Sequence, residues 1–383
     1  MALKAAKRGL IEPFIVMDVM RAANKAEATG KDILHLEVGQ PSTPAPQDVL
    51  AAATSALGSD LIGYTDAFGV PALREQISQH YKQAYAVDVG PDRICITTGS
   101  SGGFILSFLS AFDAGDRVAL ASPGYPAYRN ILKSLDVEVI NIETGPETNY
   151  QPTPELLDRI KENIDGLIIA SPSNPTGTMI SEKGLKELAS YCQARGIRII
   201  SDEIYHGITF EQNAHSMVEF DNECLVVNSF SKYYSMTGWR LGWMVFPETL
   251  SRSIECLAQN LFISAPTLSQ ISAIKAFNCK GELNSNVARY RTNRDLLLRE
   301  LPKAGFTQLS HAEGAFYIYA DVSAMTDDSN AFCQKILNET GVAITPGVDF
   351  DPERGQRYVR FSFAGSAEDM EKAASRLKKW AGQ

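Results

Sequence analysis

The residues best suited to chemistry lie in a polar and aromatic segment that runs from Ser229 to Arg240. It follows an apolar run, so we expect it to leave a buried strand and border the core. Lysines are usually solvated, and Lys232 alone would be a surface residue. A lysine that attacks an aldehyde must be partly deprotonated, and a nearby cation with limited solvation lowers the lysine pKa in that way. A Schiff base with a phosphorylated aldehyde also needs a nearby anion site, which Ser229 and Arg240 are able to build.

A second anion site is predicted in the glycine- and serine-rich segment Thr97–Gly103. Its glycines let backbone N–H groups approach a ligand, and Ser100 and Ser101 add hydroxyl donors. The helix expected after them would direct the positive end of its dipole at the ligand. The segment lacks the motifs of a P-loop and of a dinucleotide-binding fold. A tight turn without a ligand is the alternative.

Two further polar residues follow apolar runs directly. Asn174 lies in Ser-Pro-Ser-Asn-Pro-Thr-Gly, and Asp202 lies in Ser-Asp-Glu-Ile-Tyr. Ligands of open parallel sheets bind outside the carboxyl ends of the strands, so we expect both side chains to face a site. For Asp202, capping of a following helix is the alternative.

The elements that must position these residues are short apolar runs that alternate with helical patterns. Runs without a polar face are typical of strands that are covered on both sides. One helix is predicted up to Arg195, with Ser181 as its N-cap and Gly196 just beyond its end. The alternation predicts a largely parallel α/β sheet. The expected strands are 93–97, 117–120, 137–140, 166–170, 197–200 and 224–227.

The domain organisation follows from length and from a change of pattern near residue 280. A chain of 383 residues is longer than one hydrophobic core usually grows. Beyond residue 280 we expect a long charged helix over 284–301, strands near 315–319 and 358–361, and a closing helix from Ala367. The fold class is therefore α/β, with a mainly parallel sheet between helices in a large domain at 39–280. A smaller α+β domain covers 281–383, and residues 1–38 form an N-terminal arm and part of that small domain.

Charge and composition exclude several classes of protein. The net charge of −9 argues against nucleic acid or anionic membranes as partners. The apolar runs are far shorter than the roughly 20 residues of a membrane helix. Glu12, Pro13 and Asp18 interrupt the stretch that a signal peptide would need. The six cysteines are isolated and lack metal-ligand spacing, so we expect reduced cysteines, no metal and a cytoplasmic protein.

Five motifs, taken in order, resemble those of the class I/II pyridoxal-phosphate-dependent aminotransferases, which have the aspartate aminotransferase fold. They are Gly-Ser-Ser-Gly, Ser-Asn-Pro-Thr-Gly, Asp-Glu-x-Tyr, Ser-x-Ser-Lys and Met-Thr-Gly-Trp-Arg-x-Gly. The resemblance runs from about Leu36 to Arg360 and covers nearly the whole chain. It implies an enzyme with pyridoxal 5'-phosphate as its cofactor, bound by the large domain.

The resemblance also assigns roles around the cofactor ring. Lys232 would form the Schiff base, and Asp202 would keep the pyridine nitrogen protonated. Asn174 and Tyr205 would hydrogen-bond the phenolic oxygen. Tyr125, in Pro-Gly-Tyr-Pro, would stack on the ring. Lys232, Asp202 and Tyr205 are thus the expected catalytic residues.

Further positions match the family's phosphate and substrate sites. Arg360 and the backbone at Gly39, together with Asn174, would hold the α-carboxylate of the substrate. Tyr64 would reach the phosphate bound by the neighbouring subunit, which implies a homodimer with shared sites. The phosphate site itself would consist of Ser100, Ser101, Ser229 and Arg240.

The implied reaction is transfer of the amino group of an L-amino acid to a 2-oxo acid in two ping-pong half-reactions. A lyase or synthase with the same cofactor, such as a carbon–sulfur β-lyase, is the alternative. A transcription regulator built on this fold would need a basic DNA-binding module. The segment before Gly39 is too short and too mixed in charge for one.

Substrate choice is predicted from a missing cation. Some members that favour acidic substrates have a lysine where Ser101 stands, and others have a partner arginine within the stretch equivalent to 260–266. Here no arginine lies between Arg252 and Arg289. We therefore expect neutral or aromatic amino acids to be accepted at least as well as aspartate. The expected pocket walls are Phe14, Ile15 and Phe262, with Arg21 as a mobile cation for glutamate.

Overall fold

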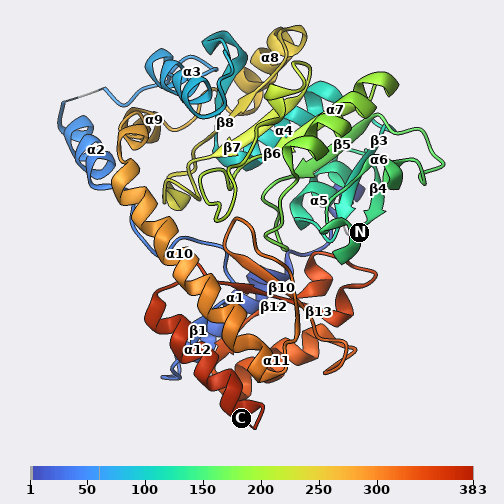
Figure 1. Cartoon of the computed structure of the whole chain (residues 1–383). Helices are drawn as coiled ribbons and strands as arrows, with labels where there is room; N and C mark the ends of the chain where they lie inside the picture. Colours follow the sequence, from blue (N-terminus) through green and yellow to red (C-terminus); the bar gives the residue numbers. More distant parts are fainter. Residues whose placement is uncertain (1–2, 60, 383) are drawn as a thin grey trace.

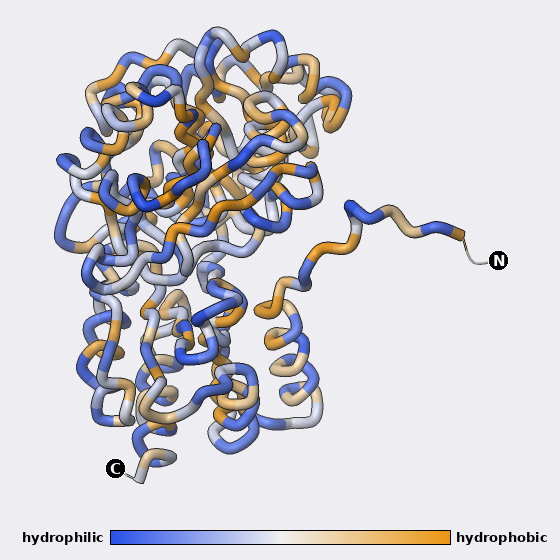
Figure 2. Tube along the Cα trace, turned by 90° about the vertical axis from the view of Figure 1, so that its right-hand side faces the viewer, coloured by the Kyte–Doolittle hydropathy of each residue, from blue (hydrophilic) through white to orange (hydrophobic). Residues whose placement is uncertain are grey.

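A larger and a smaller unit make up the computed structural model, which describes residues 3–59 and 61–382 (Figure 1). The long helix α10 (Lys280–Glu300) runs from the larger unit into the smaller one. The N-terminal residues protrude from the side of the molecule in Figure 2, and Arg8 forms an ion pair with Asp136 at 2.5 Å. Within the described ranges, no helix combines the length and the apolar character needed to cross a membrane.

The larger unit is organised around a seven-stranded sheet. Its order is β2-β8-β7-β6-β5-β3-β4. Neighbouring strands are parallel except where β8 pairs antiparallel with both β2 and β7. The prediction of a largely parallel sheet is confirmed, although β8 was not among the predicted strands. The strands are β2 (Ile94–Thr97), β3 (Arg117–Ser122), β4 (Glu138–Glu143), β5 (Gly166–Ala170), β6 (Arg198–Asp202), β7 (Leu225–Ser229) and β8 (Gly242–Val245).

Helices cover the sheet, and the core lies on both of its faces. Val226 belongs to one buried apolar cluster, whereas its neighbour Val227 belongs to a second one. Because successive side chains of a strand point to opposite faces, this alternation shows that both faces are buried. The helices of this unit are α2 (Gln47–Ser59), α3 (Pro71–Tyr85), α4 (Gly99–Ala111), α5 (Pro126–Ser134), α6 (Pro154–Leu157), α7 (Glu182–Arg195), α8 (Ser251–Leu261) and α9 (Thr267–Ala273).

Helix α7 has the ends that its sequence predicts. The Ser181 side chain accepts a hydrogen bond from Gly184 N at 3.2 Å, which satisfies one free N–H of the first turn. Gly196 ends the helix at φ +68°, a left-handed conformation that costs glycine little.

The smaller unit combines both ends of the chain. Its main sheet has the order β12-β13-β10-β9, and β1 pairs in parallel with β11. The N-terminal residues therefore pack with the C-terminal ones, and the boundaries at residues 38 and 280 stay a prediction. The elements, besides α10, are α1 (Ile15–Glu27), β1 (Leu34–His35), β9 (Gln308–Leu309), β10 (Tyr317–Asp321), α11 (Ser329–Thr340), β11 (Val342–Ala343), β12 (Thr345–Pro346), β13 (Tyr358–Ser362) and α12 (Ala367–Trp380).

Candidate active site

A cavity of about 210 Å³ brings most of the predicted site residues together. It lies where the carboxyl ends of the central strands meet the smaller unit, because β3, β5, β6 and β7 run in the same direction. The predicted residues on its wall are Gly39, Ser100, Ser101, Tyr125, Asn174, Asp202, Tyr205, Lys232, Arg240 and Arg360.

Asp202 is the last residue of β6 and is only 3% exposed. Its Oδ1 accepts from Ile204 N at 3.1 Å, and Tyr128 Oη donates to Oδ2. A turn follows β6, so the alternative of a helix cap is wrong. Burial raises the pKa of Asp202 to about 6, although both hydrogen bonds and Lys232 act in the opposite direction. Both donors to this buried carboxylate are uncharged, so it is suited to a cationic ligand.

Lys232 extends from the loop after β7 towards the same cavity. Its Nζ donates to Gly39 O at 2.7 Å. Burial lowers the pKa of Lys232 to about 8, and the positive charges of Arg360 and Arg240 add to this effect while Asp202 opposes it. A lysine with so low a pKa is partly neutral near physiological pH, as nucleophilic attack on a carbonyl group requires.

Position 39 has to be glycine because Tyr317 lies directly against it. A Cβ atom there would overlap Tyr317 Oη and lie 2.6 Å from its Cζ, far inside ordinary contact distance. The Tyr317 hydroxyl is itself held by a 2.8 Å hydrogen bond with Tyr205 Oη. The lack of a side chain at Gly39 therefore leaves room for the Tyr205–Tyr317 pair and for Lys232.

Arg360 reaches the cavity from β13 of the smaller unit and is 2% exposed. Its Nη1 donates to Asn174 Oδ1 at 2.8 Å, and its Nη2 donates to Glu37 O. Its guanidinium lies 4.4 Å from the ring centroid of Tyr317. In the part of the chain that the structure describes, Arg360 Nε has no hydrogen-bond partner. A planar fork held in this way is able to bind a carboxylate with two parallel hydrogen bonds.

The start of α4 lies close to the Arg240 guanidinium. Gly99 adopts φ +67°, and a Cβ atom there would lie 3.0 Å from Arg240 Cζ. The glycine thus lets the guanidinium approach the first turn of α4, which also carries Ser100 and Ser101. Free backbone N–H groups, two hydroxyls and one arginine are a suitable set for a phosphate group.

Some predicted residues lie outside the cavity wall. Ser229 is buried behind it, where its Oγ accepts from Ser231 N at 3.0 Å and donates to Leu241 O. Tyr64 is 83% exposed on the surface, and its role towards a neighbouring subunit stays a prediction.

Of the three predicted wall residues, Phe14 lines the cavity, and Ile15 is wrong because Val16 and Met17 take its place. Phe262 lies in the stretch that family members contribute from a partner subunit, so its role stays a prediction. The N–H of Ile15 bonds to Asp349 at the start of α1, and Phe262 packs against the core cluster beside α4.

Sequence reasoning missed two tyrosines of the site. Tyr128 lies three residues after Tyr125, so the helical spacing of α5 was a signal that both rings face one side. Tyr317 belongs to a predicted strand, but nothing in its neighbourhood indicates a partner more than 100 residues away.

Comparison with known proteins agrees with this geometry. The sequence profile of the family described as aminotransferase class I and II matches residues 31–377. The valine–pyruvate aminotransferase of Mycobacterium tuberculosis is 49% identical, with 98% of each chain covered. The solved structure of an aminotransferase from Mycobacterium tuberculosis covers 100% of both chains at 48% identity with a TM-score of 0.98.

A solved structure of Thermus thermophilus aspartate aminotransferase with maleate has a TM-score of 0.93 at 29% identity, and covers 99% of this chain and 100% of that one. The predicted aspartate aminotransferase fold is therefore confirmed. The chain belongs to the class I and II aminotransferase family, and is an enzyme that transfers the amino group of an L-amino acid to a 2-oxo acid.

Proposed function

We propose that this aminotransferase moves the amino group of an apolar L-amino acid, such as valine, to pyruvate, with pyridoxal 5'-phosphate held at Lys232. The observation that carries the substrate class is the charge on the cavity wall. Its described cations are Lys232, Arg240 and Arg360, and each has a use in holding cofactor or α-carboxylate. Phe14 and Met17 add apolar surface. A second substrate carboxylate would be desolvated there without a partner, which costs several kcal/mol.

The name of the M. tuberculosis relative, valine–pyruvate aminotransferase, supports this substrate pair. Valine has a branched apolar side chain and no second charge. Such a side chain gains free energy by burial against an apolar wall, about 25 cal/mol per Å² of apolar surface removed from water.

The residues present fit the cofactor. Asp202 offers a buried carboxylate to a cationic ring nitrogen, and the start of α4 with Arg240 offers a phosphate site. Lys232 offers an amine with a pKa of about 8. When bound, pyridoxal phosphate supplies an aldehyde that captures amines and a ring that accepts electrons from the bond broken at the α-carbon.

Lys232 would transfer the proton of the substrate, and Arg360 would bind its α-carboxylate. At pH 8 about half of the Lys232 side chains are neutral, against fewer than about one in a hundred for a lysine of ordinary pKa. A neutral Nζ is able to take the proton from the substrate α-carbon and later return it. Arg360 would fix the α-carboxylate, which orients the C–H bond towards that base. The Tyr205–Tyr317 pair would support Gly39 beside them.

We further propose that the enzyme is a cytoplasmic homodimer. Exposed apolar side chains support the dimer, since contact with a second copy would remove their surface from water. They include Leu3, Leu10, Leu57, Leu61, Ile62, Tyr64 and Ile263. The exposed N-terminal residues, which protrude in Figure 2, would be covered by a second copy.

A panel of amino donors tested with pyruvate and with 2-oxoglutarate examines the proposal. We expect valine, alanine and phenylalanine to have kcat/KM values at least equal to that of aspartate. An aspartate value about a hundredfold higher, roughly 3 kcal/mol in transition-state binding, would contradict the apolar pocket. Release of ammonia and pyruvate without any 2-oxo acid acceptor would instead indicate the β-lyase.

A further inference from the structure

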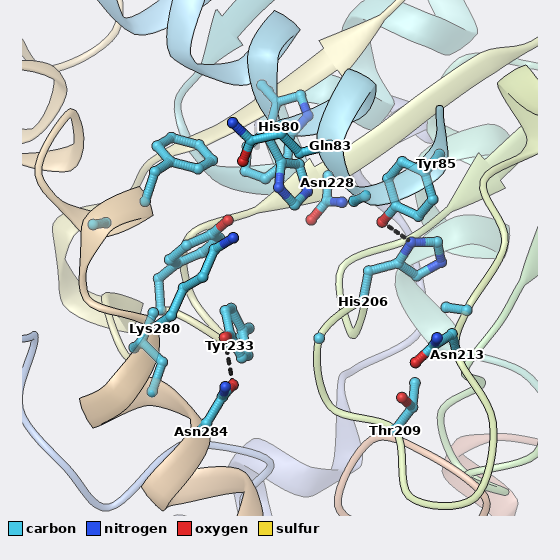
Figure 3. A pocket seen from close by; sticks show the side chains of 18 residues that line it. His80, Gln83, Tyr85, His206, Thr209, Asn213, Asn228, Tyr233, Lys280 and Asn284 are labelled. Carbon is cyan, nitrogen blue, oxygen red and sulfur yellow. Dashed lines mark hydrogen bonds between the residues drawn. The ribbon is translucent and has the colours of Figure 1, made fainter. Parts of the chain in front are cut away.

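A second cavity, of about 330 Å³, lies behind the active site (Figure 3). It is partly open to solvent and is lined by the end of α3, the chain around His206, the residues after Lys232 and the first turn of α10. Its volume is within the range of ligand-binding pockets, which starts at about 300 Å³.

The two cavities share the same two chain segments. Tyr205 and Lys232 line the active-site cavity, whereas the next residues in sequence, His206 and Tyr233, line the second one. The Tyr233 hydroxyl donates to Asn284 Oδ1 of α10 at 2.8 Å, which ties this boundary to the helix that enters the smaller unit. A ligand in the second cavity would thus contact the residues that directly follow Tyr205 and Lys232 in the sequence.

The wall carries one permanent charge. Its described residues include Lys280 and no Asp, Glu or Arg. Burial and the charge of Lys280 lower the pKa of His80 to about 4, and burial lowers the pKa of His206 to about 3, so both rings are neutral near pH 7. Glu203, which lies behind His206, has its pKa raised to about 8 by burial. A single cation without a carboxylate on the wall favours a ligand with one negative charge, whereas a polyphosphate would require several cations.

Aromatic rings and hydrogen-bonding groups form the rest of the wall. The partly buried rings of Tyr85, Tyr233 and Phe277 are able to contact a planar ligand. The buried Tyr234 and Trp243 pack against Phe277. Figure 3 shows polar side chains around the hollow, among them His80, Gln83, Thr209, Asn213, Asn228 and Asn284.

Asn228 offers a hydrogen-bond donor to the cavity. It is 4% exposed, and its Oδ1 accepts from Ser229 N at 2.7 Å. Within residues 3–59 and 61–382, its Nδ2 donates no hydrogen bond to the protein. Because Asn228 lines the cavity, its amide is able to donate to an acceptor oxygen of a ligand there.

We propose that the second cavity binds a small aryl carboxylate, with its ring between the aromatic side chains and its carboxylate beside Lys280. The hydroxyl or carbonyl oxygen of such a ligand would accept from Asn228 Nδ2. The site is separate from the substrate site, since Arg360 and Arg240 do not line it.

Calorimetric titration of the holoenzyme with 4-hydroxybenzoate tests this site, because that probe has no amino or 2-oxo group to react. The uncharged 4-hydroxybenzamide is the matched probe. Lys280→Gln removes the cation, and Lys275→Gln on the exposed surface outside this cavity is its control. Ala84→Trp, at an exposed position of the wall, fills the space by a second route.

We expect saturable binding of 4-hydroxybenzoate that Lys280→Gln and Ala84→Trp each weaken at least about tenfold, with Lys275→Gln within about twofold of wild type. The amide should bind at least about tenfold more weakly than the acid. Equal binding by wild type, Lys280→Gln and Ala84→Trp would overturn the proposal, as would the lack of saturable binding below about 10 mM. Lys280 and Ala84 do not line the active-site cavity, so a separate assay of transaminase activity tests the proposed function independently of this binding site.

Discussion

Replacing Gly39 by alanine is a direct test of how the two units meet at the active site. The added Cβ would overlap Tyr317 Oη and lie 2.6 Å from Cζ and 2.9 Å from Cε1, where ordinary contact begins at 3.4 Å. The tyrosine ring therefore has to move. It is buried, with the Arg360 guanidinium 4.4 Å from its centroid and the Tyr205 ring centroid 5.6 Å away.

The size of the effect follows from these contacts. Overpacking of a buried site costs about 1–3 kcal/mol, and loss of the Tyr205–Tyr317 hydrogen bond adds about 1 kcal/mol. If this strain raises the free energy of the transition state by the whole amount, kcat/KM decreases by about 30- to 1000-fold. Displacement of Tyr317 also disturbs Arg360, so we expect KM for the amino acid to rise.

Steady-state kinetics with the best amino donor measure the change, and thermal unfolding reports on stability. Gly281→Ala is the matched control, because a Cβ atom there meets no atom within 4 Å and the residue lies in α10. We expect the control to keep wild-type kinetics. If Gly39→Ala stays within about threefold of wild type, then Tyr317 has room to move and the close packing argued for this site is refuted.

Three further predictions concern the charged groups. Asp202→Asn should lower kcat/KM by about 10³, because it removes the charge pair between Asp202 and the cationic ring nitrogen of the cofactor. Such a pair at 4 Å contributes about 4 kcal/mol at an effective dielectric constant of 20. A kcat/KM near the wild-type value would show that Asp202 has only a structural role. In cofactor-free protein, labelling of Lys232 by an amine reagent should increase with pH, with a midpoint at about pH 8, and a midpoint near 10.5, the ordinary pKa of lysine, would contradict the lowered pKa. Arg360→Gln should raise that midpoint because it removes a nearby cation, and an unchanged or lower midpoint would show that the two groups do not interact.

The sequence predicts those site residues that lie at the carboxyl ends of strands. Asp202 and Asn174 follow apolar runs, and the rule for parallel sheets places such residues at one edge. The helix from Ser181 to Gly196 was also predictable, because its N-cap and its C-terminal glycine act locally.

Residues that depend on packing between distant segments were harder to predict from local patterns. Tyr317 carries no local signal for its contact with Gly39, and β8 enters the sheet antiparallel after a polar loop. The pocket wall was misjudged at Ile15 because the exact start of α1 decides which side chain faces the cavity. Arg360 was assigned by resemblance to a family, since its sequence neighbourhood alone shows only a strand.

The central claim, that Lys232 carries pyridoxal phosphate, is tested most directly by borohydride reduction of the purified holoenzyme followed by peptide mass mapping. Reduction converts the bond between a lysine and the cofactor into a stable amine. We predict one reduced pyridoxal phosphate group on the peptide that contains Lys232, and none in the Lys232→Ala variant treated in the same way. A label on another lysine, or a protein that takes up no cofactor, would contradict the account.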